Sequence, residues 1–101
     1  MSAATTAAPP ASACKGARDL LEHAIAHGWT VAWQPDEDSG GAPFVTIRAV
    51  RDGGNVDIRV TWHTRNTGTY RMTSAISRGG ARGWHDITLT RARQLLAGGA
   101  P

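Results

Sequence analysis

Hydrophobic positions near the two ends of the chain recur every three to four residues, which predicts a helix at each end. The first helix is predicted over residues 12–27, where the apolar side chains form one stripe. Gly16 lies inside this helix and weakens its first turn, because glycine is a poor helix former. The second helix is predicted over residues 88–97, with Asp86 or Thr88 as its N-terminal cap.

Between the helices, apolar and polar residues alternate, which predicts strands that bury one face. The predicted strands span residues 29–34, 44–51, 56–64 and 69–78. The segment 52–55, DGGN, predicts a hairpin turn, because glycine accepts the positive φ angles of such turns. The hairpin sets Ala49 opposite Ile58 and Arg48 opposite Arg59, so that the apolar residues of both strands share one face.

The segments between the predicted strands, and between the last strand and the second helix, are expected to be connections. The connections are residues 35–43, 65–68 and 79–84. In the strand over 69–78, the alternation predicts that Tyr70, Met72, Ser74 and Ile76 face inward. The inward aromatic residues, Trp29, Trp33, Trp62 and Tyr70, are interpreted as core, because they share the aliphatic face.

These elements predict an α+β fold: a helix, a four-stranded antiparallel meander and a helix, with both helices on one face of the sheet. Residues 1–11, rich in alanine, threonine and proline, are expected to be a disordered tail. Residues 12–98 then form a single domain, and 99–101 form a second short tail. The first and fourth strands would be the edges, and the face away from the helices would be open to solvent.

The open face is predicted to be polar and rich in arginine and threonine. Its residues are Thr46, Arg48, Asp57, Arg59, Thr61, His63, Thr69, Arg71 and Thr73. Arg48 and Arg59 would have Cβ atoms about 5 Å apart, a like-charge pair that costs some stability. Arg71 is expected within one rung of Arg59, and Asp57 is the only acid predicted on this face.

Charge is distributed unevenly along the chain, and this favours an anionic partner. Residues 1–43 carry two basic and five acidic side chains, a net charge of −3. Residues 44–101 carry nine arginines and three aspartates, a net charge of +6. A basic region of this kind attracts phosphates or an acidic protein surface.

The arginines of the open face are the candidate nucleic-acid contacts. A guanidinium group presents a planar fork to phosphate oxygens or a guanine edge, and threonine adds short hydrogen bonds. We expect a small non-enzymatic protein that binds nucleic acid, with DNA favoured over RNA. The predicted contacts are Arg48, Arg59, Arg71, Thr46, Thr61, His63 and Thr73, with Arg78 and Arg82 at the rim. Arginine and threonine are also ordinary solvent-side strand residues, so the same pattern is compatible with a purely structural role.

The alternative function is a protein–protein interaction module, such as a phage factor that engages a host protein or a self-associating accessory protein. It would use the acidic residues 36–38, an exposed edge strand or the same arginine face. A homodimer formed by strand addition belongs to this class.

Other chemistry is not favoured by the sequence, and no cofactor or metal is expected. His23, His27 and Asp19 share a helix face at a spacing that can hold a metal, but no further ligand is evident and a polar helix surface explains them. Cys14, the only cysteine, has no evident base partner and is interpreted as a structural thiol. No Ser/His/Asp order or paired carboxylates in apolar surroundings indicates an enzyme.

The expected setting is cytoplasmic and reducing. The single cysteine excludes an internal disulfide, and no apolar run approaches the roughly 20 residues of a membrane span. Residues 1–11 have neither a basic start nor an apolar stretch, so they do not read as a secretory signal.

Four segments carry a resemblance to small uncharacterised proteins of actinobacteria and their phages: HGWTVAWQ, PFVTIRAV, TWHTRNTGTYR and GWHDITL. This resemblance implies a source and no particular activity. The order of elements also resembles double-stranded-RNA-binding domains and the sheet-based DNA-binding arms of some integrases. The last helix opens with Thr88-Leu89-Thr90-Arg91 where the RNA-binding domains have lysines, which argues against double-stranded RNA.

Overall fold

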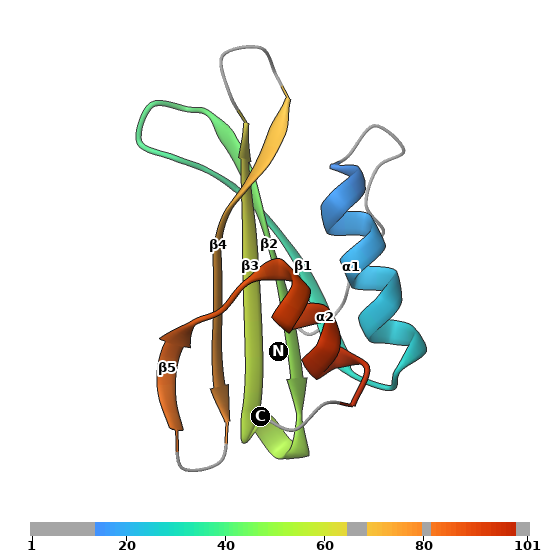
Figure 1. The fold of residues 1–101 in the computed structure, drawn as a ribbon. Coiled ribbons are helices and arrows are strands. Elements are labelled where there is room, and N and C mark those ends of the chain that lie inside the picture. The colour runs from blue at the N-terminus through green and yellow to red at the C-terminus, as the bar shows by residue number, and fades with distance from the viewer. Residues whose placement is uncertain (1–13, 65–68, 80–81, 99–101) are drawn as a thin grey trace.

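A computed structural model of the chain describes residues 14–64, 69–79 and 82–98. Its elements are α1 (Lys15–Ala26), β1 (Thr30–Glu37), β2 (Pro43–Arg51), the 3-10 turn η1 (Asp52–Gly54), β3 (Val56–Thr64), β4 (Tyr70–Gly79), β5 (Arg82–Asp86) and α2 (Leu89–Leu96). The strands form one antiparallel sheet in the order β1-β2-β3-β4-β5 (Figure 1). The α+β class and the antiparallel sheet are therefore confirmed, and the sheet has five strands where four were predicted. The predicted tails and the turn at 65–68 lie outside the described residues.

The hairpin of β2 and β3 has the predicted register. Ala49 pairs with Ile58 and Arg48 pairs with Arg59. The turn is wider than a two-residue loop, because the last paired residues are Arg51 and Val56 and η1 lies between them. Both glycines of η1 have positive φ angles, which is the reason that the sequence requires glycine there.

The preceding hairpin extends into the segment expected to be a loop. β1 continues to Glu37, which pairs with Pro43 at the start of β2. The turn is closed by Asp38, whose carboxylate Oδ1 accepts hydrogen bonds from the backbone N–H groups of Gly40 and Ala42. This Asx-type turn allows a chain rich in proline, aspartate and glycine to complete a strand pair.

A β-bulge in β4 reverses the predicted facing of its second half. Thr61 pairs with Ser74 and Trp62 pairs with Met72, which leaves Thr73 as an extra residue. Tyr70 and Met72 pack against the core as predicted. Beyond the bulge the alternation changes phase, so Ser74 and Ile76 face the open side and the inward prediction for them is wrong.

The small residues Ala75 and Ser77 take the inward positions after the bulge, and both are buried. The chain then turns back as β5, where irregular structure was predicted for residues 79–84. β5 pairs with β4, and Asp86 and His85 of β5 lie opposite Ile76 and Ser77 of β4. The sheet edges are consequently β1 and β5, so the prediction that the fourth strand is an edge is wrong.

Both helices pack on the same face of the sheet, and together with it they enclose the core. Figure 1 shows α1 and α2 side by side, away from the β5 edge. The core joins Leu20 and Leu21 of α1, Leu95 and Leu96 of α2, and the inward residues of β2 and β3 such as Ile58. The opposite face of the sheet carries no helix within the described part of the chain.

Specific polar contacts fix α2 against the sheet. Trp29 is buried, and its indole Nε1–H donates to the carbonyl of Leu96 at 2.8 Å. Thr88, one of the two predicted caps, caps α2 by accepting a hydrogen bond from Arg91 N at 3.0 Å. Neither α1 nor α2, the α-helices of the described residues, has the length and apolar composition that a membrane crossing needs.

Candidate nucleic-acid interface

The open face of the sheet brings together an arginine–tryptophan cluster at the end of the sheet near η1. We use this name for Arg48 on β2, Asp57 and Arg59 on β3, Arg78 on β4 and Trp84 on β5. Pairing of Arg48 with Arg59 and of Asp57 with Arg78 places the four charged residues on one face. Arg78, predicted at the rim, is therefore a full member of the cluster.

Asp57 is the centre of the cluster, although its side chain is completely buried. The Arg48 Nη2 donates to Asp57 Oδ2 at 3.0 Å. Arg59 bridges both carboxylate oxygens, with Nη2 3.3 Å from Oδ2 and Nε 3.4 Å from Oδ1. Asp57 is 0% exposed, whereas the side chains of Arg48 and Arg59 are 40% and 38% exposed. The two arginines thus cover the carboxylate, which offsets the repulsion expected between them.

Trp84 joins β5 to this cluster through its indole ring. The guanidinium carbon of Arg59 lies 4.7 Å from a Trp84 ring centroid, and that of Arg78 lies 5.1 Å from it. Both distances are within the range of cation–π attraction. Trp84 is nevertheless 41% exposed. The ring therefore orders two arginines without being withdrawn from solvent.

The cluster retains hydrogen-bond donors for an external acceptor. Among the contacts of the described residues, Arg48 and Arg59 use no Nη1 hydrogen bond. Arg78 donates from Nη2 to the carbonyl of Gly54 at 3.2 Å, which fixes its direction. Two guanidinium groups thus bind the carboxylate and a third lies on the neighbouring strand, and each has N–H groups that can donate hydrogen bonds to a phosphate oxygen.

The side chain of Arg48 also contains a buried hydrogen-bond donor that is not satisfied within the described residues. Its Nε is buried and has no acceptor among the described residues. A buried N–H without a partner costs about 1–3 kcal/mol. A hollow of ≈ 430 Å³ lies beside this side chain, between β1 and η1, and is lined by Thr30, Gln34, Arg48 and Gly53 among others.

A second group of predicted contacts lies farther along the same face. The hydroxyls of Thr46 and Thr61 are hydrogen-bonded at 2.9 Å, with either oxygen able to donate. Thr73, the bulge residue, lies 2.9 Å from His63 Nδ1 and also donates to the carbonyl of Thr61 at 3.4 Å. Phe44 stacks on His63, with ring centroids 4.6 Å apart and an interplanar angle of 29°. These five side chains are called the threonine–histidine strip below.

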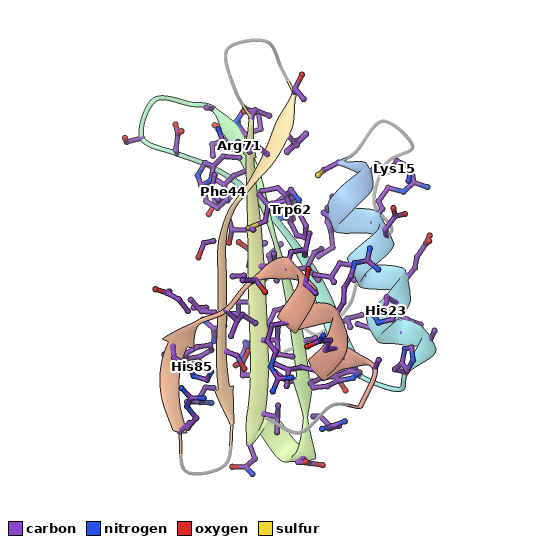
Figure 2. The ribbon with its side chains drawn as sticks, in the orientation of Figure 1. Lys15, His23, Phe44, Trp62, Arg71 and His85 are labelled. Carbon is purple, nitrogen blue, oxygen red and sulfur yellow. The ribbon has the colours of Figure 1, made fainter. Side chains whose placement is uncertain are left out.

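Arg71 does not join the arginine–tryptophan cluster. It pairs with His63, four residues from Arg59 along β3, so the expectation of a position within one rung of Arg59 is wrong. The reason is the register at this end of the hairpin, where Thr64 pairs with Tyr70 and His63 therefore pairs with Arg71. Figure 2 shows Arg71 and Phe44 at one end of the sheet and His85 at the other.

Arg82 is also separated from the open face by an irregularity. It pairs with Gly79, which in turn pairs with the core-facing Val56. This pairing assigns Arg82 to the helix-covered side of the β5 edge. By contrast, Asp86 pairs with Ile76 and lies on the open face, so Asp57 is not its only acid.

Sequence reasoning missed Trp84 and Ile76 as residues of the open face. No signal in the segment 82–86 alone predicts a strand, because RGWHD is short and glycine-containing. Unbroken alternation predicts that Ile76 faces the core, and a bulge leaves no reliable mark in one sequence.

The other candidate groups have local structural partners. Lys15 donates to Asp19 at 3.0 Å, and this hydrogen bond lowers the pKa of the Asp19 carboxyl below its ordinary value. His23 Nε2 lies 3.2 Å from the carbonyl of Arg93, and His27 Nδ1 lies 2.8 Å from that of His23. Among the described residues, no group of three potential ligands is placed to hold a metal ion. Cys14 is a free, buried thiol.

Comparison of the chain with protein-family profiles, with curated proteins and with solved structures gives no match in any of the three cases.

Proposed function

We propose that this protein binds nucleic acid through the open face of its sheet, with Arg48, Arg59 and Arg78 as phosphate contacts. The observation that carries this proposal is that two guanidinium groups bind the buried carboxylate of Asp57 while a third, from Arg78 on the neighbouring strand, lies over Trp84 on the same face. Their net positive charge and remaining N–H groups are complementary to a phosphate backbone.

The organisation of the cluster supports binding rather than simple solvation. Surface arginines ordinarily lose conformational freedom when they bind a ligand. Here Asp57 holds Arg48 and Arg59, and Trp84 stacks with Arg59 and Arg78. The arginine side chains therefore lose part of their conformational entropy on folding and lose less of it on binding. Their guanidinium groups are oriented before the ligand binds.

The threonine–histidine strip extends the proposed surface along β2 and β3. Hydroxyl and imidazole groups commonly donate to phosphate and sugar oxygens. Arg71, paired with His63, supplies a further cation at this end. The distance from Arg59 to His63 is four residues, or about 13 Å along a strand. The surface therefore accommodates several nucleotides rather than one phosphate.

A fluorescence-anisotropy titration tests the proposal. Labelled DNA, offered as a single strand and as its duplex, is titrated at about 50 and 200 mM salt, over which phosphate contacts weaken steeply. Substituting Arg59→Ala should weaken binding and reduce the magnitude of the salt slope by about 1.

Arg93→Ala is the matched control, because Arg93 is an exposed arginine on α2. It removes the same charge from the helix-covered side and should leave affinity and salt slope nearly unchanged. Equal losses in the two variants would show that only total charge matters, contrary to the proposed site. If neither form of DNA binds at the lower salt, the proposal fails, and a protein-interaction role, tested by elution volume and pull-down, becomes the better interpretation.

A further inference from the structure

The exposed indole of Trp84 is not explained by the core or by phosphate binding alone. Tryptophan offers the largest apolar surface of any side chain, and folding normally buries most of it. Trp29 and Trp62 are 5% and 4% exposed, whereas Trp84 is 41% exposed and lies on the open face. The exposed part of a planar ring is therefore available to a ligand at the β5 edge of the basic cluster.

The arginines around Trp84 suit the recognition of a base next to its phosphate. Arg59 and Arg78 lie within 4.7 and 5.1 Å of the ring centroid, so each guanidinium is itself a stacking surface. A base that stacks on the indole or on a neighbouring guanidinium would have its phosphate within reach of the same arginines.

A second pair of aromatic rings lies farther along the same face. Phe44 and His63 stack at 4.6 Å between centroids, and His63 is four residues from Arg59 along β3. This places the pair about 13 Å from the arginine–tryptophan cluster. Asp36 pairs with Phe44 and would repel phosphate there, which limits the site to the span between the two aromatic groups.

Exposed aromatic side chains on the open face can stack only with the bases of a nucleic-acid strand whose bases are unpaired. In a duplex the bases stack on one another and present only their edges in the grooves. Flat aromatic side chains on an open sheet stack with bases that are free of such pairing. We propose that the open face binds single-stranded nucleic acid in preference to duplex, with Trp84 stacking on one base. This inference rests on the proposed function and specifies its ligand.

The test compares a labelled oligothymidylate of about ten nucleotides, within the known range of single-strand site sizes, with a duplex of the same length. The single strand should bind at least about tenfold more tightly. Trp84→Ala should weaken single-strand binding at least about fivefold, as expected for loss of one stacked base. Trp84→Phe keeps an aromatic ring and should retain most of the affinity.

Trp84→Ala should weaken duplex binding by a smaller factor than single-strand binding, because the duplex loses only the ordering of Arg59 and Arg78 by the ring. Urea unfolding of each variant verifies that the fold persists. Quenching of tryptophan fluorescence by the oligonucleotide should be reduced in both variants. If both DNA forms bind equally and Trp84→Ala has no effect, the inference is overturned while the proposed function stands. A single-strand preference that survives Trp84→Ala unchanged would overturn the assignment of stacking to Trp84. If neither DNA binds, the proposed function itself fails.

Discussion

Asp57 shows how one buried residue organises a charged surface. Its carboxylate is fully enclosed, yet it lies on the face of the sheet that carries no helix in the described structure. The enclosure comes from Arg48 and Arg59, whose long apolar stems and charged ends cover it. A buried carboxylate is tolerated only when its lone pairs are met by donors, and three guanidinium N–H contacts meet them here.

Replacing this carboxylate tests its role at the residue scale. Asp57→Asn keeps the size of the side chain but removes the charge that faces two arginines. It should lower the free energy of unfolding by about 1–3 kcal/mol, less than for a fully buried ion pair because the arginines are partly exposed. Urea denaturation measures the change.

Asp86→Asn provides the comparison for this variant. Asp86 is exposed and lies on the same face, so its substitution should change stability by no more than about 0.5 kcal/mol. Equal effects of the two substitutions would mean that burial under Arg48 and Arg59 gives Asp57 no special structural role.

At the scale of elements, close contacts decide where the helices sit. Helix propensity alone predicts that Gly16 weakens α1, but a Cβ at this position would lie 3.1 Å from Trp62 Nε1. The glycine therefore allows α1 to approach the indole of β3. At the other end of the chain, the cap at Thr88 sets the start of α2 immediately after β5 and residue Ile87. Ile87 itself donates its N–H to the carbonyl of Ala75.

The cap gives a prediction for α2. Thr88→Ala removes the oxygen that accepts from Arg91 N and should cost about 1 kcal/mol of stability. Thr90→Ala, an exposed position inside the same helix, should be neutral or slightly stabilising, because alanine is the better helix former. Thermal and urea unfolding measure both. A loss for Thr90→Ala as large as that for Thr88→Ala would contradict the assigned cap.

For the whole molecule, covering one face of the sheet leaves the other available for binding. Both helices contribute to a single core, and the arginine–tryptophan cluster lies on the opposite face. The acidic residues 36–38 lie at the far end of β1, away from this cluster. Arg48, Arg59 and Arg78 thus place positive charge on the open face near η1 and β5.

The location of the cluster predicts which backbone amide signals change when an oligonucleotide binds. In amide NMR spectra, addition of a short single strand should shift the signals of β3, β4 and β5 around Arg59, Arg78 and Trp84. The signals of α1 and α2 should change little, because the sheet lies between them and the ligand. Shifts confined to α1 and α2 would mean that the ligand binds on the helix-covered side, which would contradict the proposed surface.

Much of this fold could be predicted from the sequence, because its signals are local. The helical stripes, the alternation in β2 and β3 and the DGGN turn each require only near neighbours along the chain. They determined two helices, an antiparallel sheet and the pairing of Arg48 with Arg59. The open face and two of its three clustered arginines follow from the same alternation, because side chains on a strand point alternately to its two faces.

The rest was decided only in three dimensions, because it depends on contacts between segments that no local pattern encodes. The extra residue Thr73 reverses the facing of β4, brings Ala75 and Ser77 under the helices and turns Ile76 outward. Formation of β5 depends on an edge that β4 supplies, and only this pairing carries Trp84 to Arg59. The sequence alone therefore determined that one face of the sheet is basic, whereas the tertiary structure determined which arginines meet and that an aromatic ring lies among them.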